Sequence, residues 1–216
     1  MNIPGSDLKR RVIAEADKIP GWTATHDLQI LWELCEKYVK PGGSIVELGT
    51  WKGRSTYVLA SYCKYIGAIC YTIDTFSGCV EPDSYKNKPD NLGSYNEAVV
   101  NPNFIDIAKN NLNGLPVLFF KGDSAVIADS LQDNSFDLCF IDGDHNHPRV
   151  DSDIKNFLKK VKVGGCLSGH DLCNPEGDVF EALNSVIGSN YKDMIAYDDT
   201  GVPYAATTIW IHEVKK

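Results

Sequence analysis

Histidines and aspartates gather directly after two short apolar segments in the second half of the chain. The segment FDLCFID ends on Asp142, and the segment GGCLSG is followed at once by His170 and Asp171. If the two segments are neighbouring parallel strands, about 4.8 Å apart, Asp142 and the pair that follows the second strand converge. Carboxylate oxygens and imidazole nitrogens both bind divalent metal ions. The sequence therefore predicts a metal site formed by Asp142, His170 and Asp171.

The imidazole of His170 affects which metal ion the site would prefer. Magnesium prefers ligation by oxygen alone, so His170 either shifts the preference toward manganese, iron or zinc, or means that no metal binds. Both outcomes stay open from the sequence. His145 follows Asp142 by three residues and offers a second chemistry. An unperturbed imidazole, with a pKa near ~6.5, is mostly a free base at neutral pH and can accept a proton.

A second group of residues predicts the binding of an amino-acid zwitterion. In VELGTWKGRST, a strand ends at Glu47 and turns through Gly49 and Gly53 into a helix. Glycine lets the backbone approach a ligand closely, and a helix N-terminus offers N–H groups to a carboxylate. The acidic strand end suits a cationic amine, as in the methionine part of S-adenosylmethionine. The turn does not suit a dinucleotide, because Trp51 and Arg54 occupy positions at which the dinucleotide-binding fingerprint G-x-G-x-x-G requires glycine.

Residues at two further strand ends predict that the same ligand also contains a nucleoside. Asp74 closes the strand YTID, where a carboxylate can accept hydrogen bonds from both hydroxyls of a ribose. Asp123 and Ser124 close the next strand in FFKGDSA, where they can meet the exocyclic amine of an adenine. The tripeptide GDS alone is also a good turn and helix cap. Together with the glycine turn, these residues predict an adenosine that carries an amino acid.

The elements that would position these residues alternate between short apolar strands and amphipathic helices. Apolar residues at three- and four-residue spacing predict a helix over 25–40 with Thr25 as its N-cap. Similar stripes predict helices over 150–161 and 179–187. Such alternation indicates a mostly parallel sheet with helices on both faces. The predicted strands cover residues 44–48, 68–74, 117–121, 136–142 and 165–170.

Three segments lie outside this alternation, within what we expect to be a single domain over 1–216. Residues 1–40 form a helical extension at the N-terminus. Residues 76–94 are a long polar loop rich in Pro, Gly and Asn, typical of a lid beside a site. Residues 191–197 and 205–214 predict two strands of a terminal antiparallel hairpin.

Composition and charge restrict the partners. The chain has 216 residues, with 21 Lys and Arg against 29 Asp and Glu, which gives a formal net charge of -8 and a pI of about 5.1. An acidic surface repels phosphate backbones, so we expect a small-molecule partner and no nucleic acid. No run of ~18 apolar residues is present, so we expect no membrane span. The seven cysteines, largely in apolar runs and without a zinc-type CxxC pair, favour a reducing, cytoplasmic location.

From about Thr25 to Val214, the chain resembles class I S-adenosylmethionine-dependent methyltransferases in its successive motifs VELGTWKGRST, YTIDTF, KGDS, FDLCFIDGDHNH and GGCLSGHD. The similarity is to the small-molecule branch with macrocin-type and catechol-type O-methyltransferases and cephalosporin-hydroxylase-like proteins. The resemblance implies a Rossmann-like α/β fold with a seven-stranded, mostly parallel sheet, an antiparallel last strand and helices on both faces. It implies that the cofactor S-adenosylmethionine is held by Glu47, Gly49, Thr50, Trp51, Gly53, Ser55, Asp74, Thr75, Asp123, Ser124 and Asp142.

The resemblance also implies methyl transfer with a base and a metal. The spacing from Asp142 to His145 is similar to that of macrocin-type enzymes, in which the histidine is thought to take the proton of the acceptor hydroxyl. Asp142 and His145 are therefore the candidate catalytic residues. Related metal-dependent enzymes have an acid at the end of the fourth strand and an acidic or amide pair after the fifth. His170 stands where an acid is usual, and magnesium or manganese is the divalent metal that the resemblance suggests.

Two other functions stay open from the sequence. A non-catalytic S-adenosylmethionine-binding module on the same fold would bind the cofactor without depending on His145. A metal-dependent hydrolase or oxygenase would instead use tightly bound zinc or iron and would not need Glu47 or Asp74. Its ligands would be the cluster Asp142, His145, His170 and Asp171.

The methyl acceptor is not identified by the sequence. We expect the residues that select it in segments 76–94 and 172–177. A homo-oligomer also stays open, because the N-terminal helix and the apolar segment TTIWI offer surfaces for a second copy of the chain.

Overall fold

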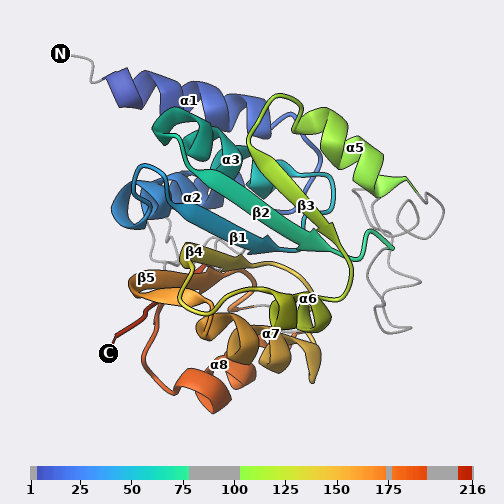
Figure 1. Cartoon of the computed structure of the whole chain (residues 1–216), viewed down its shortest axis with the longest axis vertical. Helices are drawn as coiled ribbons and strands as arrows, with labels where there is room; N and C mark the ends of the chain where they lie inside the picture. Colours follow the sequence, from blue (N-terminus) through green and yellow to red (C-terminus); the bar gives the residue numbers. More distant parts are fainter. Residues whose placement is uncertain (1–3, 78–102, 174–176, 194–208, 216) are drawn as a thin grey trace, which may run out of the picture.

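A seven-stranded sheet runs through the structure, with helices on both of its sides (Figure 1). The computed structural model describes residues 4–77, 103–173, 177–193 and 209–215. Its helices are α1 (Pro4–Ala16), α2 (Thr25–Tyr38), α3 (Arg54–Ile66), α5 (Phe104–Asn111), α6 (Ser124–Ser130), α7 (Arg149–Leu158) and α8 (Val179–Ile187). Its strands are β1 (Ser44–Leu48), β2 (Ile69–Asp74), β3 (Val117–Lys121), β4 (Phe136–Ile141), β5 (Val161–Gly169), β6 (Lys192–Asp193) and β7 (Trp210–Glu213).

The strand order is β3-β2-β1-β4-β5-β7-β6. Strands β1 to β5 pair in parallel, whereas β7 runs antiparallel to both β5 and β6. The predicted fold class is therefore confirmed. The strand order reverses at β1, which lies between β2 and β4. Open α/β sheets bind ligands at such a reversal, outside the carboxyl ends of the strands. The ends of β1, β2 and β4 are therefore where a ligand site is expected.

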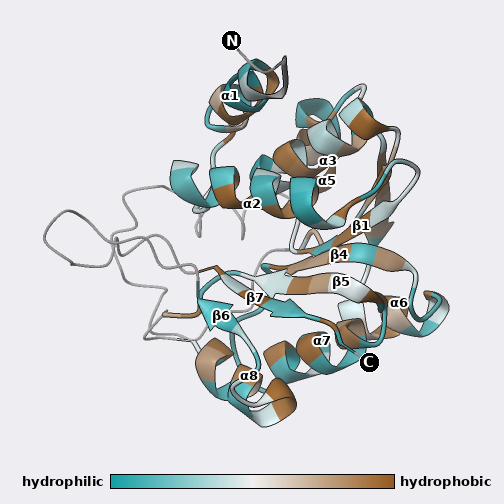
Figure 2. Ribbon diagram, turned by 90° about the vertical axis from the view of Figure 1, so that its left-hand side faces the viewer, coloured by the Kyte–Doolittle hydropathy of each residue, from teal (hydrophilic) through white to brown (hydrophobic). Residues whose placement is uncertain are grey.

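The helices form two layers. In both views, α1, α2, α3 and α5 lie on one side of the sheet and α6, α7 and α8 on the other (Figures 1 and 2). Strand β1 contributes side chains to the hydrophobic cores on both faces of the sheet. Ile45 belongs to the same cluster as Trp32 of α2, and Val46 belongs to the same cluster as Phe157 of α7. A strand covered on both faces has no polar side, which explains why the central strands are continuous apolar runs.

Helix α2 differs from its prediction at both ends. It stops at Tyr38 rather than at residue 40, and its N-cap is Ala24, so the predicted capping role of Thr25 is wrong. The Asp27 carboxylate accepts a hydrogen bond from the Ala24 N–H at 3.3 Å, while the Thr25 hydroxyl donates to Asp17 at 2.8 Å. The start of α2 is thus capped by an acid from inside its first turn.

The strand predictions hold with small shifts. Strands β1 and β3 have the predicted bounds, β2 starts one residue later, and β4 ends one residue earlier than predicted. Strand β5 is longer than expected, because Val161, predicted to end the preceding helix, begins this strand. Residues 78–94 of the predicted lid loop lie outside the described residues, as do residues 194–208 of the predicted terminal hairpin. The described parts of that hairpin, β6 and β7, pair antiparallel, which confirms the predicted pairing. Among the described helices, none is long and apolar enough to cross a membrane.

Candidate functional site

The turn after β1 packs directly against the end of β4. Gly49 has a φ of 88°, and a Cβ atom added to it would lie 1.9 Å from the carbonyl oxygen of Asp142. The Asp142 N–H in turn donates to the Leu48 carbonyl at 2.8 Å. Only glycine meets both the positive φ and this close approach. The glycine turn and the Asp142 segment are therefore fixed beside one another.

Asp74, at the end of β2, holds this turn in place. Its Oδ2 accepts hydrogen bonds from the backbone N–H groups of Thr50 and Trp51, both at 2.8 Å, and its Oδ1 accepts from the Phe76 N–H at 2.7 Å. A carboxylate has about four lone-pair sites. Three of these sites are occupied by backbone N–H groups. Asp74 can therefore accept from both hydroxyls of a ribose, as predicted, only if one of the three backbone hydrogen bonds breaks.

Glu47 lies inside the protein rather than at its surface. Its side chain is 0% exposed and accepts hydrogen bonds from the hydroxyls of Ser55 at 2.6 Å, Thr72 at 2.8 Å, and Thr56. Burial raises its pKa from 4.5 to about 7, although the three hydroxyls act in the opposite direction. In this structure Glu47 therefore anchors the start of α3 and the middle of β2, and its carboxylate is not open to the amine of a ligand.

Asp123 and Ser124 begin α6 and have different surroundings. The Asp123 Oδ1 caps the helix by accepting from the Ala125 N–H at 2.9 Å, and its Oδ2 lies 3.5 Å from Nη1 of Arg149. The Ser124 hydroxyl donates to Asp153 of α7 at 2.5 Å. Burial raises the pKa of Asp153 to about 6. Asp123 keeps a half-exposed carboxylate, whereas the Ser124 hydroxyl is already paired.

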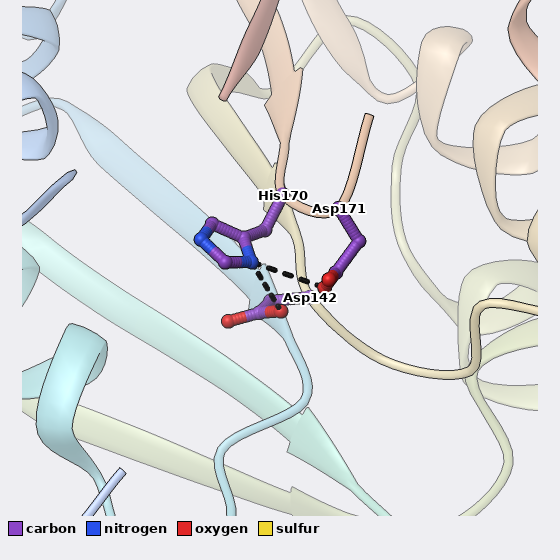
Figure 3. Close-up of side chains that lie close together, drawn as sticks. All are labelled: Asp142, His170 and Asp171. Carbon is purple, nitrogen blue, oxygen red and sulfur yellow. Dashed lines mark hydrogen bonds and ion pairs between the residues drawn. The ribbon is translucent and has the colours of Figure 1, made fainter. Parts of the chain in front are cut away.

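Three of the predicted residues meet at the ends of β4 and β5 (Figure 3). The Nδ1 of His170 lies 3.0 Å from Oδ2 of Asp171 and 3.8 Å from Oδ1 of Asp142. Two ligands at right angles around an ion, with ~2.1 Å bonds, are ~3.0 Å apart, so these separations suit a common ion. The ligand atoms of all three residues lie within 4.8 Å of one another. Two carboxylates and one imidazole nitrogen form a donor set that fits a divalent transition metal.

Charge is concentrated in this cluster. Burial alone would lower the pKa of His170, but Asp142, Asp171 and Asp27 outweigh it and raise the pKa well above its ordinary value. Burial raises the pKa of Asp142. Because Figure 3 shows one nitrogen of the imidazole facing Asp142 and Asp171 and the other pointing away, the two sides of the ring meet different partners.

The partner on the far side of the ring is Asp27 of α2, which was not among the residues predicted from the sequence. Its Oδ2 lies 3.1 Å from Nε2 of His170. Asp27 is 0% exposed, and its Oδ1 has no hydrogen-bond partner among the described residues. An aspartate in the first turn of a helix is typical of a cap, so the sequence carried no signal that separates Asp27 from an ordinary capping residue.

His145 lies next to this cluster. Its Nε2 is 3.4 Å from Oδ2 of Asp171, and its side chain is 24% exposed. The backbone carbonyl of His145 accepts from the Asp178 N–H at 2.7 Å, which ties its segment to the start of α8. His147 has different partners, because its Nδ1 pairs with Asp151, which raises the pKa of His147. The structure therefore places the predicted base, His145, beside the predicted metal ligands.

Trp51, within the glycine turn, forms an aromatic pair with a residue of the N-terminal segment. Trp51 stacks on Trp22, with ring centroids 4.5 Å apart, and the ammonium of Lys52 lies 4.6 Å from the Trp51 ring. Trp22 is 55% exposed and comes from the connection between α1 and α2. Trp22 could not be predicted as a site residue from the sequence, because its contact with Trp51 depends on how this connection folds back.

Arg54 fixes that connection. Its Nε donates to the Thr23 carbonyl at 2.8 Å, its Nη1 donates to the carbonyls of Asp17 and Ile19, both at 2.9 Å, and its Nη2 pairs with the Asp17 carboxylate. A planar guanidinium suits such a fan of acceptors. Arg54 occupies the position at which the dinucleotide fingerprint has its last glycine. Its side chain therefore holds the N-terminal segment against the start of α3.

The predicted residues thus form separate groups at one edge of the sheet. Asp142, His145, His170 and Asp171 come together, as do Thr50, Trp51 and Asp74. Thr75 shapes the turn after β2 by accepting from the Ser77 hydroxyl at 2.9 Å. Glu47 and Ser55 lie beneath the glycine turn, and Asp123 and Ser124 lie toward α7.

A comparison with known families fits this arrangement. The model of a family described as "Methyltransferase domain" matches residues 46–172, more than half of the chain. The chain belongs to this family of methyltransferase domains. It is an S-adenosylmethionine-dependent methyltransferase.

Solved structures share the fold at low sequence identity. Precorrin 8w decarboxylase from Methanobacterium thermoautotrophicum is 18% identical with a TM-score of 0.56, over 90% of this chain and 92% of that one. The calicheamicin methyltransferase CalS11 is 14% identical with a TM-score of 0.59, over 97% and 93% of the two chains. Cofactor-bound Rv0187 from MTB is 15% identical with a TM-score of 0.60, over 100% and 92%.

Proposed function

We propose that this methyltransferase acts on a hydroxyl group of a small-molecule acceptor, with His145 as the base. One observation carries the proposal. His145 follows Asp142 at the end of β4, and the Asp142 carbonyl lies against Gly49 in the turn proposed to face the methyl donor. The base and the donor-binding turn are therefore on neighbouring strand ends, as a transfer between two bound molecules requires.

The donor would be held by the backbone of Gly49, Thr50, Trp51 and Gly53, and by the carboxylates of Asp74 and Asp123. The partly exposed carboxylate of Asp74 keeps one acceptor site for a ribose hydroxyl. Glu47 would act indirectly, by fixing Ser55 at the start of α3. Ser124 would likewise act through its bond to Asp153. Two further residues complete the proposed cofactor site. Thr75 follows Asp74 in the chain, and Asp142 lies beside the glycine turn.

The reaction needs one base and accurate alignment. The acceptor oxygen bonds to the sulfonium methyl carbon as the carbon–sulfur bond breaks, S-adenosylhomocysteine leaves, and the hydroxyl proton passes to the imidazole of His145. Asp171, 3.4 Å from Nε2 of His145, stabilises the positive charge that the imidazole gains. Orientation of donor and acceptor supplies most of the remaining effect.

We include a divalent metal at Asp142, His170 and Asp171 in the proposed site. A bound ion would lower the pKa of an acceptor hydroxyl that coordinates it. The ligand residues lie between the glycine turn and His145, so they would also orient the acceptor for the base.

Two observations support a small acceptor. The net charge of -8 disfavours a nucleic-acid substrate. CalS11, the calicheamicin methyltransferase compared above, is a TDP-rhamnose 3'-O-methyltransferase; its apo structure is 13% identical with a TM-score of 0.54, over 97% of this chain and 95% of that one. That protein is an example of a sugar hydroxyl serving as the methyl acceptor on this scaffold.

The proposal is tested by a panel of sugars, nucleotide sugars and phenols, with release of S-adenosylhomocysteine as the readout, in the presence and absence of a chelator. Titration calorimetry with S-adenosylmethionine, S-adenosylhomocysteine and NAD accompanies it. We expect both sulfur nucleosides to bind, NAD not to bind, and turnover with at least one hydroxyl acceptor. Turnover only with amine acceptors would overturn the assignment to hydroxyl groups.

A further inference from the structure

We propose that Asp27 is a positioning residue that orients the His170 imidazole for metal binding, so that the site selects a manganese-, iron- or zinc-type ion over magnesium. The inference rests on the metal site included in the proposed function. It adds to that site a residue from the N-terminal extension. Asp27 lies outside residues 46–172, the part of the chain that the methyltransferase family model matches.

The geometry of the His170 imidazole supports this role of Asp27. Its Nε2 lies 3.1 Å from Oδ2 of Asp27, whereas its Nδ1 faces Asp171 at 3.0 Å and Asp142 at 3.8 Å (Figure 3). A histidine that ligates a metal commonly donates its other ring N–H to a carboxylate, which fixes both the tautomer and the ring orientation. Asp27 is placed to receive that hydrogen bond. With an ion bound, Nδ1 would offer its lone pair to the ion between the two aspartates, in place of its hydrogen bond to Asp171.

The burial of Asp27 also supports a role beyond helix capping. The side chain is 0% exposed, its Oδ1 has no hydrogen-bond partner among the described residues, and its Oδ2 is shared between the Ala24 N–H and His170. A buried carboxylate with so few donors is costly. An exposed serine or threonine would cap α2 without that cost. Capping alone therefore does not account for Asp27, whereas its pairing with the buried His170 imidazole does.

The surrounding fold holds Asp27 in position. Arg54 binds the carbonyls of Asp17, Ile19 and Thr23, so the segment that enters α2 is tied to the start of α3. Inside α2, Leu28 and Leu31 are 0% exposed and anchor the helix in the core. A rigid supporting residue is what a defined ligand orientation requires.

The donor set then determines the class of ion. Two carboxylate oxygens and one imidazole nitrogen suit manganese, iron and zinc, whereas magnesium prefers oxygen ligands and retains its waters. We expect the metal-free protein to bind Mn²⁺ at least ~10-fold more tightly than Mg²⁺, and we expect His170→Asn, which replaces the nitrogen ligand by an amide, to reduce this ratio.

The test measures binding of Mn²⁺, added as the chloride, to the full chain by the loss of the free-ion paramagnetic resonance signal, with Mg²⁺ as competitor. We expect Asp27→Asn to weaken Mn²⁺ binding ~10–100-fold. The matched control is Asp137→Asn. Asp137 is also a buried acid, but it pairs with Lys162 and the Ser44 N–H at the opposite end of β4. We expect the control to bind Mn²⁺ as the unchanged protein does.

A second measurement does not depend on any variant being folded. Nitrogen NMR of the imidazoles in the zinc-loaded, unchanged protein should show His170 bound through Nδ1 and protonated at Nε2. Zinc on Nε2, equal affinity for Mn²⁺ in Asp27→Asn, or magnesium bound as tightly as manganese would each overturn the inference. The same holds if no ion binds. S-adenosylhomocysteine binding, measured in parallel, separates such a failure from a failure of the proposed methyl transfer.

Discussion

Replacement of Glu47 by glutamine tests whether this carboxylate supports the fold or contacts the cofactor. In the structure the side chain is fully buried and accepts from the hydroxyls of Ser55, Thr56 and Thr72. Glutamine has the same shape. Its carbonyl can accept from the two threonines, and its amide can donate to the Ser55 hydroxyl, which rotates to accept. Glu47→Gln therefore removes the charge and preserves the network.

The magnitude follows from the pKa of Glu47. Burial raises it from 4.5 to about 7 in the folded protein. The folded state thus holds this proton more tightly than the unfolded chain, and the stability associated with it is lost as the pH rises from 4.5 to 7. At pH 8 the buried charge costs about 3 kcal/mol, and at pH 5 it costs under about 1 kcal/mol. We expect Glu47→Gln to be more stable than the unchanged protein by about these amounts.

The assay is urea unfolding of both proteins at pH 5, 6, 7 and 8, followed by circular dichroism. Glu33→Gln is the control, because Glu33 is an exposed acid on α2 and its loss should change stability by less than ~0.5 kcal/mol at every pH. A difference between Glu47→Gln and the unchanged protein that stays constant from pH 5 to 8 would refute the reasoning about burial.

The same variant separates two roles of Glu47. The sequence predicts that it binds the amine of the cofactor, and loss of such a charged hydrogen bond would cost ~1.5–3 kcal/mol, or ~10–150-fold in affinity. The structure instead has Glu47 enclosed by hydroxyls, so we expect the affinity for S-adenosylmethionine to change less than ~3-fold. Titration calorimetry at pH 7 distinguishes these results.

Three further predictions concern the edge of the sheet. His145→Gln should reduce kcat for methyl transfer ~10²–10⁴-fold while leaving the calorimetric affinity for S-adenosylmethionine unchanged, since the residue acts on the acceptor proton; equal loss of binding would argue against a base. Gly49→Ala should destabilise the protein by at least ~2 kcal/mol in urea unfolding, because its Cβ would lie 1.9 Å from the Asp142 carbonyl at a φ of 88°; wild-type stability would contradict this. Arg54→Lys should cost about 2 kcal/mol in the same assay, because lysine cannot reach the Asp17, Ile19 and Thr23 acceptors together, and an unchanged midpoint would mean that the N-terminal segment is held by other contacts.

Much of the sheet could be predicted from local patterns. Strands β1 and β3 have the predicted bounds because each is a short apolar run closed by glycine or acidic residues. The meeting of Asp142 with His170 and Asp171 also followed from the sequence, because side chains after neighbouring parallel strands must lie at one edge.

Contacts that depend on tertiary packing could not be predicted. The pairing of Asp27 with His170 joins residues 143 positions apart, and a first-turn aspartate has the same pattern whether it only caps a helix or also supports a site. Glu47 shows the complementary case. Its position at the end of β1 indicates a ligand contact, but the hydroxyls that enclose it come from α3 and β2. Only their packing decides that the side chain points inward.

The most direct test of the proposed methyl transfer is a crystal structure of the full chain with bound S-adenosylhomocysteine. We expect the nucleoside at the turn formed by residues 49–53, its ribose against Asp74 and its sulfur on the side of Asp142 and His145. The same compound found at another edge of the sheet, or found with its sulfur directed away from His145, would contradict the assignment of this edge as the place of methyl transfer.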